Sequence, residues 1–129
     1  MIPNRAARFP GFCSAVTVEE SIFESSSLSE IQHIADVVES NIDELGGEAV
    51  ELHEGVLSIE FSQGTFVINK HGASKQIWYS SPVSQPAYFD ALTDMGRRWW
   101  SIRLQTSLRQ KLEKDIRTIT GKDLDLKSN

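Results

Sequence analysis

The sequence predicts an α+β fold, an α/β sandwich in which two helices pack on one face of an antiparallel sheet of about five to six strands. Two observations and one packing argument predict it. Apolar residues recur with helical spacing near the start of the 129-residue chain and again near its end. The residues between them alternate apolar with polar and are interrupted by tight turns, which is typical of an antiparallel meander. Packing both helices on one sheet face is the economical way to bury the apolar stripe of each helix and the apolar face of the sheet.

The first helix is predicted over residues 28–45, after a loop and cap signal at Ser25-Ser26-Ser27 and before Gly46-Gly47. Its apolar positions follow helical spacing and cluster on one side of a helical wheel. They are Ile31, Ile34, Ala35, Val38, Ile42 and Leu45. Gln32, Asp36, Glu39 and Asp43 form a stripe on one flank, and His33, Ser40 and Glu44 lie opposite the core.

The period then changes from 3.6 to 2, which predicts strands. The inward-facing residues are predicted to be Val50, Leu52, Leu57, Ile59, Phe61, Phe66, Ile68, Ile77 and Tyr79. The same alternation leaves Ser58, Glu60, Val67, Asn69, Gln76 and Trp78 on the solvent face. Short strands are also expected at 88–89 and 98–102, with Trp100 and Ile102 as the core pair of the latter.

A second helix begins at Ser107, because Ser107 and Gln110 form a capping-box pair. Leu108, Leu112, Ile116 and Ile119 follow helical spacing, and Gly121 ends the helix. The folded domain is therefore expected over residues 24–122, followed by a C-terminal tail at 123–129.

Residues 1–20 are expected to lie outside the fold. The first eighteen carry Arg5 and Arg8 but no acid, a composition typical of a mitochondrial transit peptide. Pro3 and Pro10 disfavour a stable helix, so a disordered tail explains the same composition.

Charge is strongly polarised along the chain. Between Arg8 and Lys70 there is no Lys or Arg but there are twelve acidic residues. From Phe61 onward there are eleven basic and six acidic residues. A surface of one sign attracts the opposite sign. The first half therefore favours cations or a basic protein and disfavours nucleic acid.

Several kinds of chemistry have no motif in the sequence. There is no phosphate-binding Gly-rich loop, paired-cysteine zinc spacing, EF-hand loop or nucleophile elbow. The three histidines, His33, His53 and His71, are not spaced as a metal triad, and the single Cys13 cannot form an internal disulfide. No apolar run approaches the roughly 20 residues of a membrane span. No catalytic residue is predicted.

The acidic stripe is one candidate site. Asp36, Glu39 and Asp43 lie on the first helix, with Glu44 and Glu51 beyond them. Neighbouring like charges without interleaved Lys are unfavourable, and exposed carboxylates suit hard or borderline divalent metals held weakly. His33, one turn before Asp36, is a candidate nitrogen ligand. The alternative is a solvated helix face without a ligand.

The second candidate is Trp78 with Gln76 and Asn69. An exposed Trp among hydrogen-bonding side chains is typical of a protein-binding hot spot. The alternatives are that Trp78 belongs to the core, or that Trp78 with Lys70 and Lys75 forms a single-stranded nucleic-acid surface.

The segment Gly64-Thr65-Phe66-Val67-Ile68-Asn69-Lys70, followed by Lys75-Gln76-Ile77-Trp78-Tyr79-Ser80-Ser81-Pro82, closely resembles the signature of the frataxin family. The resemblance extends over about residues 28–119. It implies a mitochondrial matrix protein that binds Fe²⁺ or Fe³⁺ weakly. We expect no tightly bound cofactor and a monomeric protein. The resemblance also implies docking on the cysteine desulfurase and iron–sulfur scaffold complex, as an activator or iron donor of cluster assembly. A ferroxidase activity is attributed to the family.

By position, the resemblance assigns iron binding to Asp36, Asp43, Glu44 and Glu51, with Glu39 beside them. It assigns partner binding to Asn69, Gln76 and Trp78, and we add the neighbouring Lys70. The sequence departs from the family at Ala87-Tyr88, where an Arg is usual before the Phe/Tyr-Asp pair, and at Ala91, where a Trp is usual. Val37 and Ser40 also make the acidic ridge thinner than usual.

Overall fold

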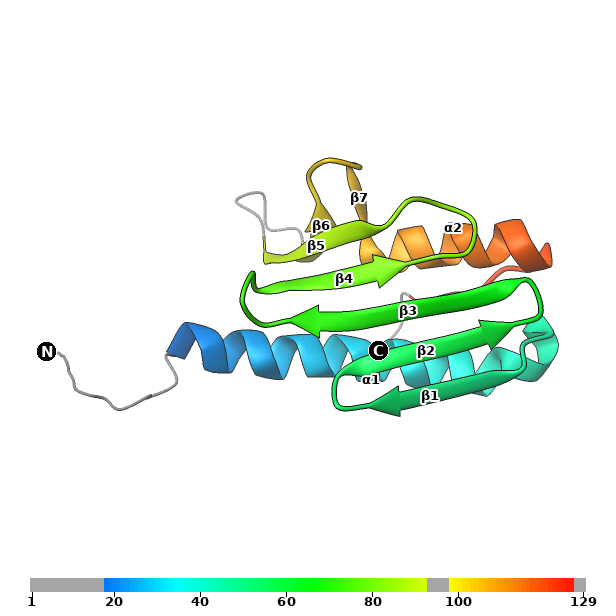
Figure 1. The fold of residues 1–129 in the computed structure, drawn as a ribbon, viewed down its shortest axis with the longest axis horizontal. Coiled ribbons are helices and arrows are strands. Elements are labelled where there is room, and N and C mark those ends of the chain that lie inside the picture. The colour runs from blue at the N-terminus through cyan, green and yellow to red at the C-terminus, as the bar shows by residue number, and fades with distance from the viewer. Residues whose placement is uncertain (1–17, 93–97, 127–129) are drawn as a thin grey trace, which may run out of the picture.

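The computed structural model describes residues 18–92 and 98–126 as two layers, with both helices behind one seven-stranded sheet (Figure 1). The helices are α1 (Val18–Leu45) and α2 (Leu108–Thr120). The strands are β1 (Ala49–His53), β2 (Val56–Phe61), β3 (Gly64–His71), β4 (Gln76–Ser80), β5 (Ala87–Leu92), β6 (Arg98–Ser101) and β7 (Thr106–Ser107). This arrangement confirms the predicted α/β sandwich.

The sheet is a simple meander in which the strands lie in the order β1 to β7, each antiparallel to the next. Its register places core residues directly opposite one another, as in Ile59 against Phe66 and Ile77 against Phe89. The β1–β2 turn is the predicted Glu54-Gly55, both at positive φ (50° and 78°), the conformation that tight hairpin turns need. The described chain has one strand more than predicted, because the two-residue β7 is too short to show alternation.

Helix α1 begins at Val18, so the prediction that it starts after the serine run is wrong. The serines do not interrupt the helix, because Ser27 is buried and its Oγ donates to the carbonyl of Glu24 at 3.2 Å. The added turns have their own tertiary contacts. Phe23 packs edge-on against Trp99, with ring centroids 6.2 Å apart. The predicted helix end is confirmed, since Gly46 follows the last helical residue at φ 75°.

The core pairing predicted for the sixth strand is also wrong. Trp100 pairs with Asp90, which places it on the outer face of the sheet, and Ile102 lies in a turn with 63% of its surface exposed. Trp99 points inward instead and is 3% exposed. Adjacent residues on a strand face opposite sides, so one of the two tryptophans had to be outside.

The second helix begins and ends as predicted. Ser107 forms the capping box with Gln110, and Gly121 closes the helix at φ 72°, a left-handed conformation that favours glycine. The chain beyond Gly121 returns to the core, where Leu124 and Leu126 are buried. The segment expected as a tail from residue 123 therefore has a packed beginning.

A buried polar cluster joins the sheet to α2. The Tyr79 hydroxyl donates to the Asp115 carboxylate at 2.5 Å, and the Ser84 hydroxyl donates to the same oxygen at 2.7 Å. Lys111 lies 3.5 Å from that oxygen. Burial of the tyrosine is the largest cause that raises the pKa of Tyr79 far above its usual value of 10. The hydrogen bond to the Asp115 carboxylate raises this pKa further.

This pKa shift makes the free energy of unfolding depend on alkaline pH. Above about pH 10 the unfolded tyrosine loses its proton whereas the folded one keeps it, so the contribution of Tyr79 to stability falls as pH rises. Above pH 10, we expect the free energy of unfolding of wild-type protein to fall by up to about 1.4 kcal/mol per pH unit more than that of Tyr79→Phe. Urea unfolding of both proteins from pH 8 to 11 measures the difference. Parallel losses in the two proteins would contradict the assignment.

Candidate functional site

The outer face of the sheet, opposite the helices, brings three of the predicted partner-binding residues together. Asn69 on β3 pairs directly with Trp78 on β4, and Gln76 lies two residues before Trp78 on the same strand. All three are half-buried, whereas Ile77 and Tyr79 beside them are buried. The predicted alternation is therefore confirmed, and Trp78 is not a core residue.

Two further rings contact Trp78. His71 stacks on it, with ring centroids 3.7 Å apart and planes at 13°. Tyr88 on β5 lies directly opposite Trp78 and tilts towards it, with centroids 5.0 Å apart. We call His71, Trp78 and Tyr88 the aromatic patch. Its most exposed ring is Tyr88, at 49%.

A directed chain of hydrogen bonds fixes the edge of the Trp78 ring. Trp78 Nε1 donates to Gln76 Oε1 at 3.2 Å, and Gln76 Nε2 donates to Asp90 Oδ1 at 3.1 Å. The indole can only donate and the carboxylate can only accept, so the Gln76 amide has one orientation that satisfies both. His71, Tyr88 and Asp90 were not predicted from the sequence to belong to this site. The strand register would have identified them, because each lies on the same face as Trp78.

Lys70 does not belong to this face. It pairs with the inward-facing Ile77, and its ammonium contacts Glu24 of α1 at 2.6 Å. The ion pair ties the first turns of α1 to β3. A nucleic-acid surface built from Trp78 and Lys70 would need both on one face, and the structure places them on opposite faces.

The predicted iron-binding carboxylates are all exposed to solvent. They are Asp36, Glu39, Asp43, Glu44 and Glu51. The four on α1 lie on the helix that packs against edge strand β1, which carries Glu51 (Figure 1). Gln32 Nε2 donates to Asp36 Oδ1 at 2.9 Å. Within residues 18–92 and 98–126, no three His, Cys, Asp or Glu side chains are grouped so that they could hold a metal ion.

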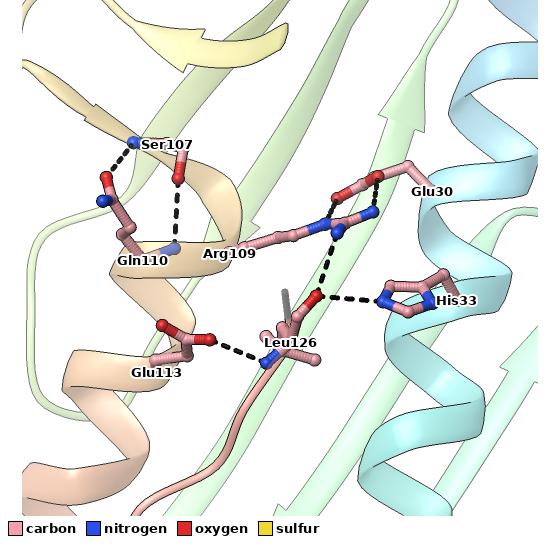
Figure 2. A network of polar contacts seen from close by, with 7 residues as sticks. All are labelled: Glu30, His33, Ser107, Arg109, Gln110, Glu113 and Leu126. Carbon is pink, nitrogen blue, oxygen red and sulfur yellow. Dashed lines mark hydrogen bonds and ion pairs between the residues drawn. The ribbon is translucent and has the colours of Figure 1, made fainter. Parts of the chain in front are cut away.

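His33 faces the C-terminal segment, not a carboxylate cluster. Its Nε2 lies 3.0 Å from the backbone carbonyl oxygen of Leu126 (Figure 2). A carbonyl oxygen only accepts, so Nε2 carries the proton and only Nδ1 keeps a lone pair for a metal. The contact gives His33 a structural role between α1 and the end of the domain.

The same carbonyl belongs to a larger network that joins the two helices (Figure 2). Arg109 of α2 donates two hydrogen bonds of 2.8 Å to the carboxylate of Glu30 on α1, and a third, of 2.9 Å, to the Leu126 carbonyl. Glu113 accepts from the backbone N–H of Leu126 at 2.7 Å. The hydrogen bond from Arg109 to Glu30 raises the pKa of the guanidinium. Arg109 therefore stays charged, as its buried partner requires.

The fold and its outer face together define a class of protein, a two-layer α/β sandwich that leaves an aromatic and amide-rich sheet face open. Comparison with known proteins identifies the family within that class. The family model described as Frataxin-like domain matches residues 16–122. The chain belongs to the frataxin family.

Individual relatives support the same family assignment. The chain is 42% identical over 81 residues to mitochondrial frataxin of Dictyostelium discoideum, a match that covers 62% of this chain and 42% of that protein. It is 30% identical over 139 residues to a mitochondrial frataxin-like protein of Leishmania donovani, covering 93% of this chain and 74% of that protein. The match therefore spans less than half of the Dictyostelium protein.

A solved structure also supports the assignment to the frataxin family. The trimeric frataxin from Saccharomyces cerevisiae, complexed with ferrous iron, superposes with a TM-score of 0.65 at 34% identity. The superposition covers 75% of this chain and 87% of the yeast chain. Among the described residues, neither α1 nor α2 has the combination of length and hydropathy that a transmembrane helix requires.

Proposed function

We propose that this protein promotes iron–sulfur cluster assembly by docking the outer face of its sheet on a complex of cysteine desulfurase and scaffold protein. The observation that carries the proposal is the Trp78 site. A tryptophan held by hydrogen bonds and ring contacts on an open sheet face is preformed for protein binding. The frataxin family membership supports the choice of partner. The names of the mitochondrial relatives support a mitochondrial location, which we propose to be the matrix.

We propose that the protein binds iron weakly, as cargo. The yeast frataxin described as complexed with ferrous iron supports Fe²⁺ binding by this chain as well. The exposed carboxylates Asp36, Glu39 and Asp43 on α1 are oxygen ligands of the kind that hold a hydrated divalent ion weakly. His33 can join this ligand set only through Nδ1, because its Nε2 donates to the Leu126 carbonyl.

The direct test is cluster assembly with purified cysteine desulfurase and scaffold protein, with iron, cysteine and a reductant supplied. Added wild-type protein is expected to raise the initial rate until it is equimolar with the complex. A rate that is unchanged at saturating protein would refute the proposed function, although it would leave the family and the fold intact.

The carboxylates have two possible uses, holding iron or meeting a basic partner surface, and one variant separates them. Neutralising the stripe in Asp36→Asn/Glu39→Gln/Asp43→Asn is expected to abolish Fe²⁺-induced broadening of amide signals near α1. It should lower the assembly rate in parallel at limiting iron. The iron role would be excluded by a variant that binds no iron yet stimulates assembly fully at limiting Fe²⁺.

A further inference from the structure

Trp78 is restrained by residues that none of the partner assignments includes. One face of the ring is covered by His71, whose own Nδ1 lies 2.7 Å from the Ser74 hydroxyl. Tyr88 flanks the ring from the neighbouring strand. The Nε1 edge is held through Gln76 by Asp90. The ring is thus restrained on three sides, and every restraint comes from the outer face itself.

We propose that Asp90 and His71 are positioning residues that fix the orientation of Trp78 before a partner arrives, so that Tyr88 and the free edge of Trp78 form a rigid contact surface. The structural part of this inference stands on the contacts alone. Its consequence for docking rests on the proposed function.

The role of Asp90 follows from the direction of the two hydrogen bonds. Without an acceptor at position 90, only the indole N–H still orients the Gln76 amide, and the amide oxygen can exchange that hydrogen bond for one to water. The Trp78 ring then samples more orientations in the free protein. Restoring a single orientation on binding has an entropic cost, and freezing one side chain corresponds to a loss of about three- to tenfold in affinity.

Two variants at position 90 separate hydrogen bonding from charge. Asp90→Ala removes the acceptor, whereas Asp90→Asn keeps an oxygen that accepts from Gln76 but removes the charge. Asp123→Ala is the matched control, because Asp123 is an exposed carboxylate beside α2, on the helical side of the molecule. His71→Ala tests the stacking restraint independently, and it keeps the inference testable if Asp90→Ala folds poorly.

The first readout needs no partner. The indole N–H signal of Trp78, assigned by its loss in Trp78→Phe, is expected to shift and to exchange with solvent several-fold faster in Asp90→Ala and in His71→Ala. Asp90→Asn and Asp123→Ala should leave the signal as in wild type. An indole signal that is unchanged in both Asp90→Ala and His71→Ala would overturn the inference, whatever the protein's function.

The second readout is the affinity for the purified desulfurase–scaffold complex, measured by calorimetry. Asp90→Ala is expected to bind about three- to tenfold more weakly than wild type, and Asp90→Asn within about twofold of it. If the Trp78 indole N–H exchanged faster in Asp90→Ala while the affinity for the complex stayed unchanged, the positioning role in docking would be overturned. Failure of wild-type protein to bind would refute the proposed function and this docking role with it, while the indole signal still decides whether Trp78 is held.

Discussion

Arg109→Ala is expected to destabilise the fold by about 3 kcal/mol, because it leaves the carboxylate of Glu30 buried without its partner. Glu30 is 8% exposed, and its carboxylate accepts two hydrogen bonds from Arg109. The variant also removes a donor to the Leu126 carbonyl, which loosens the C-terminal segment from α1 and α2. For a domain of this size the unfolding midpoint should fall by about 10 °C or more, measured by thermal unfolding.

Arg117→Ala is the matched control, since it removes the same side chain from the same helix. Its ion pair with Asp123 is 3.4 Å long, and both side chains are more than 70% exposed (71% and 78%). Such surface pairs contribute about 0–1 kcal/mol, so this variant should unfold close to the wild-type temperature. Arg109→Lys should fall between the two, because Lys cannot make two parallel bonds to one carboxylate. Equal midpoints for Arg109→Ala and Arg117→Ala would contradict the assigned role of Arg109.

Trp78→Ala is expected to weaken binding to the desulfurase–scaffold complex by about 30-fold, the effect typical of a hot-spot residue. Stimulation of cluster assembly at limiting protein should be lost with it. Trp78 is half-buried on the outer face and lies outside the hydrophobic core, so the unfolding midpoint should change by much less than in Arg109→Ala. Calorimetric titration and the initial assembly rate measure the two functional effects.

Leu28→Ala serves as the control for Trp78→Ala. Leu28 is an apolar residue on α1 that is 40% exposed, so its truncation also removes accessible apolar surface, but from the helical layer. It should bind and stimulate as wild type does. If both variants weakened binding to the same extent, the loss at Trp78 would not reflect a specific contact surface.

Local patterns predicted much of this fold because the responsible interactions are local. Period-2 alternation separated Trp78 from its buried neighbours Ile77 and Tyr79, since a strand has only two faces. The capping box at Ser107 and the helix end at Gly121 lie within a few residues of the backbone groups they satisfy. Such features can be identified without knowledge of the tertiary structure.

Contacts between distant parts of the chain could not be predicted from local patterns. His33 reaches the carbonyl of a residue 93 positions away, so no spacing near His33 shows that its Nε2 is occupied. Lys70 was added to the predicted partner site as the neighbour of Asn69, but the residue faces α1 and pairs with Glu24, 46 positions earlier. The serine run resembled an N-cap because serine favours the position just before a helix begins, yet tertiary burial of Phe23 and Ser27 extends α1 through it.

The central claim is that the outer face of the sheet is the docking surface, and mapping that surface by NMR tests it most directly. We would titrate isotopically labelled protein with the unlabelled desulfurase–scaffold complex. The indole signal of Trp78 and the side-chain amides of Asn69 and Gln76 are expected to shift or broaden first, while the buried Trp99 indole stays unchanged. Changes confined to α1 and α2, with the Trp78 signal unaffected at saturation, would contradict the account.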